Sequence, residues 1–290
     1  MYTTLISVSE LQALQSSGAP LLVFDCSFDL AQPDAGRDMF AQSHIAGAVY
    51  ADLNTNLSAK GDPHVTGAQS GGRHPLPSRE KFAQWLSEIG FANAKQAVVY
   101  DRQGANYCGR LWWMLKWLGH DAVAVLNGGL QAWTAQAGEL ATGAPVASHA
   151  RGDGFSISPS TVALVDAATV LGNLGHSQQT IVDARAAPRF KGEMEPLDPV
   201  AGHIPGALNR PFGQNLTPEG FFKPAAVLRA EWEALLGQRP SDSVVHQCGS
   251  GVSALPNLLA MEIAGLHHSA LFAGSWSEWC SDPSRPVATG

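Results

Sequence analysis

Short apolar runs alternate along the chain with longer stretches in which apolar residues recur at helical spacing. The runs at residues 21–24, 98–100 and 122–126 have the length of buried strands, and the patterns at 80–89 and 111–118 are those of amphipathic helices. Strands that alternate with helices are typical of a parallel sheet covered by helices. The pattern therefore predicts an α/β fold.

The first half of the chain repeats in the second half. Residues 23–25 match residues 181–183, and the segment His-Ile-Ala-Gly-Ala at 44–48 matches His-Ile-Pro-Gly-Ala at 203–207. Because both pairs of segments are displaced along the chain by almost the same distance, the matches indicate a duplication. The repeat predicts two similar α/β domains, packed side by side.

At 290 residues the chain has the length of two ordinary domains. The Gly-rich stretch at 138–159 has few large apolar residues and no helical period, which is typical of a linker. We therefore expect a first domain at 1–138, a linker at 139–159 and a second domain at 160–290. The first half also carries an insertion near 58–77, whose Gly, Ser, Thr and Pro residues predict a long loop.

Four polar residues are assigned to local structure. Ser9 and Asp166 each precede an apolar helical stretch and have the chemistry of a helix N-cap. His44 and His203 occupy the same place in the two repeats. We expect each of these histidines to fix a turn after a strand rather than to act in catalysis.

Composition restricts the classes of function. The net charge of -7 and the lack of a Lys/Arg-rich run argue against a nucleic-acid partner. No apolar run approaches the roughly 20 residues that cross a bilayer, and the amino terminus lacks the features of a secretory signal. These features predict a cytoplasmic protein that acts on a small substrate and has no membrane partner.

The four cysteines are scattered along the chain, at 26, 108, 248 and 280. Their spacing matches neither a structural zinc site nor a disulfide framework. The nearby histidines at 246, 267 and 268 lack a second, properly spaced pair of ligands. We therefore expect free thiols and no metal site.

Cys248 has a context that the other cysteines lack. It follows the apolar pair Val244-Val245 and precedes a helical stretch at 255–264, which places it at the carboxyl end of a parallel strand, where α/β sheets bind ligands. Alignment of the two halves pairs it with Arg102, so the first half has no equivalent thiol. Backbone N–H groups of the Gly-Ser-Gly-Val-Ser turn can converge on the sulfur and stabilise a thiolate, and the glycines permit a tight bend with positive φ. The alternative is a buried structural cysteine before an ordinary turn.

The segment from Cys248 to Ala254, Cys-Gly-Ser-Gly-Val-Ser-Ala, resembles the active-site loop of the tandem rhodanese-type sulfurtransferases, in the form found in 3-mercaptopyruvate sulfurtransferases. The likeness extends to the two His-Ile-x-Gly-Ala segments, to 127–133, to Asp183-Ala184-Arg185 with Arg189-Phe190, and to 274–279. It implies two tandem rhodanese-like domains, each a small doubly wound parallel sheet flanked by helices. It also implies that the first domain is catalytically silent.

By this resemblance Cys248 is the nucleophile, whose thiolate takes a sulfur atom from a small anionic donor and holds it as a persulfide. The favoured donor is 3-mercaptopyruvate, and the acceptor is a thiol or cyanide, with a thioredoxin-like protein as one candidate. The chemistry requires no metal or organic cofactor. Arg189 stands where the family binds the anionic group of the donor, since a guanidinium suits a carboxylate. Further contacts to the donor are expected from the loop, at Gly249, Ser250, Gly251, Val252 and Ser253.

Ser250 and His74 are implied to act in catalysis together with Cys248. A hydroxyl at position 250 can relay a proton, and His74, in the segment Arg-His-Pro-Leu-Pro, resembles the histidine that approaches this serine in the family. An acidic residue orients that histidine in the family, whereas this chain has Asn54 at the corresponding position. The alternative for His74 is a structural role.

Two features bear on the identity of the donor. The loop after Cys248 has no cationic side chain, which favours 3-mercaptopyruvate over the doubly charged thiosulfate. Against this, Leu197 stands where the family has a second carboxylate-binding arginine, and Arg185 and Arg73 are the candidates to compensate. Sulfur transfer from thiosulfate to cyanide is therefore the alternative activity.

Two other classes of function fit the sequence less well. A cysteine phosphatase needs an arginine six residues after the cysteine to hold the phosphoryl oxygens, and Ala254 stands at that position. A non-enzymatic rhodanese-like binding or sensing module is expected to have lost the cysteine, whereas Cys248, both loop glycines and Arg189 are all present. Catalysis of sulfur transfer is favoured on both counts.

Overall fold

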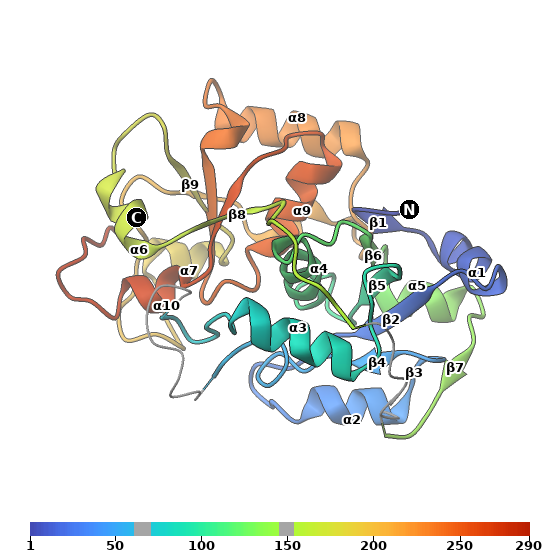
Figure 1. Ribbon diagram of the computed structural model, residues 1–290. Coiled ribbons are helices and arrows are strands. Elements are labelled where there is room, and N and C mark those ends of the chain that lie inside the picture. Colours follow the sequence, from blue (N-terminus) through green and yellow to red (C-terminus); the bar gives the residue numbers. More distant parts are fainter. Residues whose placement is uncertain (61–70, 145–153) are drawn as a thin grey trace. The chain divides into compact units, whose positions relative to one another are not determined.

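The computed structural model describes residues 1–60, 71–144 and 154–290, and Figure 1 shows the course of the chain. The chain forms two compact units. Unit 1 comprises Met1–Ala59, Pro77–Thr161 and Pro218–Phe221, and unit 2 comprises Lys60–Leu76, Val162–Thr217 and Phe222–Gly290. A segment from the first half of the sequence therefore joins the second unit.

The linker and the inserted loop are described only in part. Much of the loop expected at 58–77 falls on residues 61–70, which lie outside the described residues. Within the stretch interpreted as a linker, Leu140–Ala141 forms the short strand β7. The domain boundaries expected at 138 and 160 stay a prediction.

Unit 1 is built on a five-stranded sheet in the order β1-β6-β5-β2-β4, with all strands parallel. The sheet strands are β1 (Leu5–Ile6), β2 (Leu21–Asp25), β4 (Val49–Tyr50), β5 (Gln96–Tyr100) and β6 (Val123–Leu126), and β3 (His44–Ile45) pairs separately with β7. The helices are α1 (Val8–Ser16), α2 (Ala35–Gln42), α3 (Arg79–Glu88), α4 (Cys108–Trp117) and α5 (Gly129–Ala135). Every residue of β5 and β6 is buried, as expected of strands that helices cover on both faces.

Unit 2 has a second five-stranded parallel sheet, in the order β10-β9-β11-β12-β8. Its strands are β8 (Ala163–Val165), β9 (Thr180–Asp183), β10 (Leu208–Asn209), β11 (Val244–Gln247) and β12 (Ala270–Phe272). Its helices are α6 (Ala167–Gly172), α7 (Ala187–Lys191), α8 (Ala225–Leu236), α9 (Leu255–Ile263) and α10 (Ser275–Trp279), with 3-10 turns at Phe212–Asn215 and Ser241–Ser243. In Figure 1, α8 and α9 lie side by side, and α9 packs against β11 and β12.

The two sheets have the same topology. Read from one edge, β1, β6, β5, β2 and β4 of unit 1 correspond to β8, β12, β11, β9 and β10 of unit 2. The correspondence follows from the repeated order of apolar runs, because each run takes the same place in its own sheet. The prediction of two similar α/β domains with small parallel sheets is confirmed.

Strand register corrects one detail of the repeat. In unit 1 the last paired residues of β2 and β5 are Asp25 and Tyr100. In unit 2 the last paired residues of β9 and β11 are Asp183 and Gln247. Asp101, and not Arg102, therefore occupies the place of Cys248. The sequence alignment slipped by one residue because β5 carries a run of similar small apolar residues that fits two registers.

The structure corrects two of the predicted helix starts. Ser7, not Ser9, is the N-cap of α1, and it forms a capping box in which its Oγ accepts the Glu10 N–H at 3.3 Å and its own N–H donates to the Glu10 carboxylate at 2.8 Å. Asp166 is confirmed as the N-cap of α6, accepting the Thr169 N–H at 2.8 Å. The helix expected from 111 begins earlier, at Cys108.

The two repeated histidines make matching contacts, and each stands just before a turn, at 46–47 and at 205–206. Nδ1 of His44 donates to the Phe40 carbonyl at 2.8 Å and its ring stacks on Phe40 at 3.8 Å. His203 repeats both contacts with Phe190, at the same two distances. Phe40 and Phe190 belong to α2 and α7. Each histidine therefore ties the end of a helix to the chain that enters the turn, and the helix is the partner that the sequence did not reveal.

Within the described ranges, every helix is too short or too polar to span a bilayer.

Candidate active site

Cys248 directly follows β11, the central strand of the unit 2 sheet. Its side chain is buried. The N–H of Cys248 donates to Oγ of Ser275 at 3.0 Å, and its carbonyl accepts the Trp276 N–H at 2.9 Å. The carbonyl of Gly249 accepts the Ser277 N–H, also at 2.9 Å. The first turn of α10 thus holds the backbone of the cysteine and of the residue after it.

Gly251 gives the loop its bend. Its φ is +74°, and a Cβ at this position would lie 2.1 Å from the Ala273 carbonyl oxygen. Only glycine fits such a backbone at such a distance, so the predicted need for positive φ is confirmed at Gly251. Gly249 is not among the residues with positive φ.

The matching loop of unit 1 surrounds the side-chain carboxylate of Asp101 with backbone N–H groups. Oδ1 of Asp101 accepts the N–H groups of Gln103 and Ala105, both at 2.9 Å, and Oδ2 accepts those of Tyr107 at 2.8 Å and Cys108 at 2.9 Å. Burial raises the pKa of Asp101, and the four N–H groups oppose that shift by stabilising the carboxylate. The loop between strand and helix in this fold can therefore surround a negative group with backbone donors.

The two loops have the same length and one bend in common, although Ala105 also has positive φ and its counterpart Val252 does not. Each starts at the residue after the central strand and leads into the next helix, α4 or α9. Gly104, with φ +68°, and Gly251, with φ +74°, stand at the same place in the two loops. The anion in unit 1 belongs to the chain itself, whereas unit 2 has a thiol at that position.

Ser250 and His74 lie in contact. Nδ1 of His74 is 2.7 Å from Oγ of Ser250, and both side chains are buried. His74 reaches this position on the segment of unit 2 that comes from the first half of the sequence. The neighbouring Arg73 anchors that segment, because its N–H donates to Oγ of Ser277 at 2.9 Å.

Arg189 projects from α7 and is held by two carboxylates. Its Nε and Nη2 donate to Glu195 at 3.1 and 2.6 Å, and Nη2 also lies 3.2 Å from Oδ2 of Asp198. Burial would raise the pKa of Glu195, but hydrogen bonds and charge from Arg189 outweigh it, so the pKa lies below its ordinary value. Glu195 therefore stays ionised and fixes the guanidinium.

The sequence did not identify Glu195, Asp198 and Arg73 as partners in one cluster. Nη1 of Arg73 is 2.5 Å from Oδ1 of Asp198, whose side chain is only 4% exposed. The signal available was the pair of acidic residues that flank Leu197, three positions apart. Their partners are distant in sequence or on another element, so spacing could not reveal the cluster.

The remaining predicted residues have simpler surroundings. Val252 is buried and Ser253 is half-buried within the loop. The other three cysteines are buried free thiols, at Cys26, Cys108 and Cys280. Burial raises the pKa of each of these thiols, which keeps them protonated.

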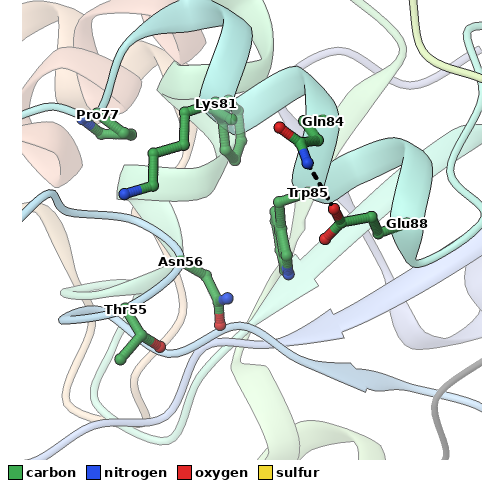
Figure 2. A pocket seen from close by; sticks show the side chains of 8 residues that line it. Thr55, Asn56, Pro77, Lys81, Gln84, Trp85 and Glu88 are labelled. Atoms are coloured by element: carbon green, nitrogen blue, oxygen red, sulfur yellow. Dashed lines mark hydrogen bonds between the residues drawn. The ribbon is translucent and has the colours of Figure 1, made fainter.

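Two pockets lie elsewhere in the units. Figure 2 shows one of about 220 Å³ in unit 1, where Lys81, Gln84, Trp85 and Glu88 of α3 face Asn56 across the opening. A second, of about 470 Å³, opens in unit 2 at the start of β9, the strand end opposite to the one that Cys248 follows. Neither pocket is lined by a residue of the Cys248 loop.

Comparison with known proteins identifies the family. The rhodanese-like domain matches this chain twice, at residues 7–136 and 166–282. A probable 3-mercaptopyruvate sulfurtransferase of Pseudomonas aeruginosa is 46% identical over 279 residues, which cover 96% of this chain and 95% of the relative. A putative thiosulfate sulfurtransferase of Mycobacterium tuberculosis, SseB, is 37% identical over 289 residues, covering 99% and 97%. The structure of the 3-mercaptopyruvate sulfurtransferase from Leishmania major aligns with a TM-score of 0.81 at 30% identity, covering 96% of this chain and 74% of that one. The chain therefore belongs to the rhodanese-like family of sulfurtransferases and carries two of the family's domains in tandem.

Proposed function

We propose that this sulfurtransferase moves sulfur through a persulfide on Cys248, with 3-mercaptopyruvate as the donor and a thiol or cyanide as the acceptor. One observation carries the proposal: Cys248 occupies the position at which the matching loop of unit 1 surrounds the Asp101 carboxylate with four N–H groups. By that correspondence a negative sulfur on Cys248 meets the N–H groups of Ser250, Val252 and Ala254, whereas the N–H of Leu255 donates to the Val252 carbonyl at 3.1 Å. Such donors stabilise both a thiolate and a persulfide anion.

The sulfur step is a displacement at the sulfur of the donor. The thiolate of Cys248 attacks that sulfur, a new S–S bond forms, and the C–S bond of mercaptopyruvate breaks. The electron pair of the broken bond stays on the carbon as the enolate of pyruvate, which takes up a proton to give pyruvate. An acceptor thiolate or cyanide then attacks the outer sulfur, the S–S bond breaks, and the thiolate of Cys248 returns.

Ser250 and His74 are proposed to supply the proton that the enolate needs. The contact of 2.7 Å between Nδ1 of His74 and Oγ of Ser250 allows the serine to donate to the ketone oxygen of the donor while the imidazole replenishes its proton. Arg189 and the loop N–H groups are proposed to bind the donor's carboxylate and carbonyl. The absence of a cationic side chain from the loop supports a donor with a single carboxylate.

Unit 1 is proposed to be the silent copy. A carboxylate at Asp101 cannot accept a sulfur atom, and it already occupies the N–H groups that would stabilise a sulfur anion. The choice of acceptor, including a thioredoxin-like protein, and the cytoplasmic location stay predictions from the sequence.

Parallel turnover assays test the proposal. Purified protein is incubated with 3-mercaptopyruvate or thiosulfate, with cyanide as the acceptor, and the product thiocyanate is measured. Mass spectrometry of the protein exposed to donor alone should show the gain of one sulfur atom on the peptide that contains Cys248. A higher kcat/KM for thiosulfate would replace the proposed donor by the alternative one, and a protein that gains no sulfur from either donor would favour a binding module.

A further inference from the structure

Two guanidinium groups converge on Gly249, the residue next to Cys248. A Cβ at Gly249 would lie 3.1 Å from Nη2 of Arg73 and 3.4 Å from Nη1 of Arg189. The two arginines come from different segments of unit 2, Arg73 from Lys60–Leu76 and Arg189 from α7. Position 249 thus has no side chain of its own and is flanked by two cations.

Asp198 bridges the two arginines. Its Oδ1 lies 2.5 Å from Nη1 of Arg73, and its Oδ2 lies 3.2 Å from Nη2 of Arg189. One buried carboxylate therefore sets the separation of the two guanidinium groups. Ser277 adds a second restraint, because its Oγ accepts the Arg73 N–H and its own N–H donates to the Gly249 carbonyl, both at 2.9 Å.

The arginines keep donors directed towards the loop. Nε and Nη2 of Arg189 are engaged by carboxylates, and its Nη1 is the atom of this guanidinium that lies closest to position 249. Nε of Arg73 is buried and has no hydrogen-bond partner among the described residues. The arginine side chains are 18% and 21% exposed, so each is partly accessible to a small anion. A carboxylate placed between them would receive a donor from each.

Arg185, the other candidate for a second carboxylate-binding arginine, already has partners within unit 2. Its Nη2 donates to Asp183 at 2.6 Å and to the Gly202 carbonyl at 2.7 Å, and its guanidinium stacks on the Trp276 ring at 4.6 Å. Its side chain is only 1% exposed. Arg185 therefore neutralises the buried aspartate at the end of β9 and cannot turn to a substrate without leaving that charge unpaired.

We propose that Arg73 is the second arginine that binds the carboxylate of the donor, and that Asp198 is the residue that positions it beside Arg189. This inference rests on the proposed function. It names Arg73 as a group that selects sulfur donors with a carboxylate. Arg73 takes the role that an arginine at position 197 would have; Leu197 at that position is 45% exposed.

Substrate binding without turnover tests the role of Arg73. The Cys248→Ser protein is titrated with 3-mercaptopyruvate by calorimetry, with and without Arg73→Met. Loss of one charge-assisted hydrogen bond should raise Kd roughly ten- to a hundredfold. Arg229→Met is the matched control, because Arg229 is half exposed and pairs with Glu233 on α8; its Kd should not change. Equal Kd values with and without Arg73→Met, including no binding by either protein, overturn the inference.

A donor that lacks the carboxylate distinguishes a loss of carboxylate binding from a general loss of structure. Arg73→Met and Asp198→Asn, each with Cys248 intact, are assayed with 3-mercaptopyruvate and with mercaptoacetone, in which a methyl group replaces the carboxylate. KM for mercaptopyruvate should rise with kcat largely kept, and kcat/KM for mercaptoacetone should not change. Equal losses for both donors would show that the cluster only holds the structure together, and would refute the inference. The proposed donor is judged separately, from wild-type turnover, before any variant is compared.

Discussion

Replacement of Gly251 by alanine should damage both the stability and the activity of unit 2. The backbone at Gly251 has φ +74°, a region that costs an L-residue about 1 to 2 kcal/mol. The added Cβ would also lie 2.1 Å from the Ala273 carbonyl oxygen and 2.8 Å from its carbon, so the backbone must shift. Overpacking of this kind costs about 1 to 3 kcal/mol. The two effects together should lower the free energy of unfolding by about 2 to 5 kcal/mol.

Gly175→Ala shows the first effect, the cost of positive φ, without the second. Gly175 lies in the same unit with φ +78°, but a Cβ there meets nothing within 4 Å. Urea unfolding should therefore show a loss of about 1 to 2 kcal/mol for Gly175→Ala and a clearly larger loss for Gly251→Ala. Sulfur loading of Cys248, followed by mass spectrometry, should slow on the order of a hundredfold in Gly251→Ala alone, because the loop N–H groups move. If the two variants unfold at the same urea concentration and load sulfur at the wild-type rate, the loop is not packed against Ala273 as described.

Three further changes test other parts of the structure. Cys248→Ser should abolish sulfur transfer, measured as thiocyanate formed, whereas Cys280→Ser should keep most of it; turnover by the first variant would contradict the persulfide mechanism. Burial lowers the pKa of His246 from its ordinary 6.5 to about 3 in the folded protein. Between these pH values the unfolded chain therefore binds a proton at His246 that the folded protein does not bind. The free energy of unfolding should then fall by about 1.4 kcal/mol per pH unit as the pH drops through that window. Acid titrations followed by circular dichroism should show a weaker decline for His246→Leu, and identical curves would disprove the assignment. Asp101→Ala leaves four N–H groups without their acceptor and should lower the unfolding free energy by about 3 kcal/mol or more in urea; a loss within the error of wild type would mean that water replaces the carboxylate.

The elements followed from the sequence because their signals are local. Apolar runs of strand length and apolar residues at helical spacing depend only on neighbouring residues, and they predicted strands and helices to within a few residues of their observed bounds. The capping box at the start of α1 was also readable, since Ser7 and Glu10 have the required spacing. Ser9 also precedes apolar residues, so residue type alone does not distinguish it from Ser7 as the N-cap.

The repeat was visible in the sequence, whereas its register was not. Matching segments identified the duplication because both copies keep the residues that end their strands. Register depends on the hydrogen-bonded neighbour, and only the pairing of Asp25 with Tyr100 and of Asp183 with Gln247 establishes that Asp101 stands in the place of Cys248. A run of small apolar residues carries too little information to distinguish registers that differ by one.

By itself the sequence determined the α/β architecture, the duplication and the place of the Cys248 loop between a strand and a helix, because each of these depends on short contiguous segments. Tertiary structure alone decided which charged groups meet around that loop. Arg73 and Asp198 are 125 positions apart in the chain, and their contact arises only when the segment before α3 packs against α10 and the chain after α7 returns to the same place. Long-range ion pairs produce no periodic pattern in a sequence. Their partners meet because of where the folded elements end, not because of how far apart the residues stand in the chain.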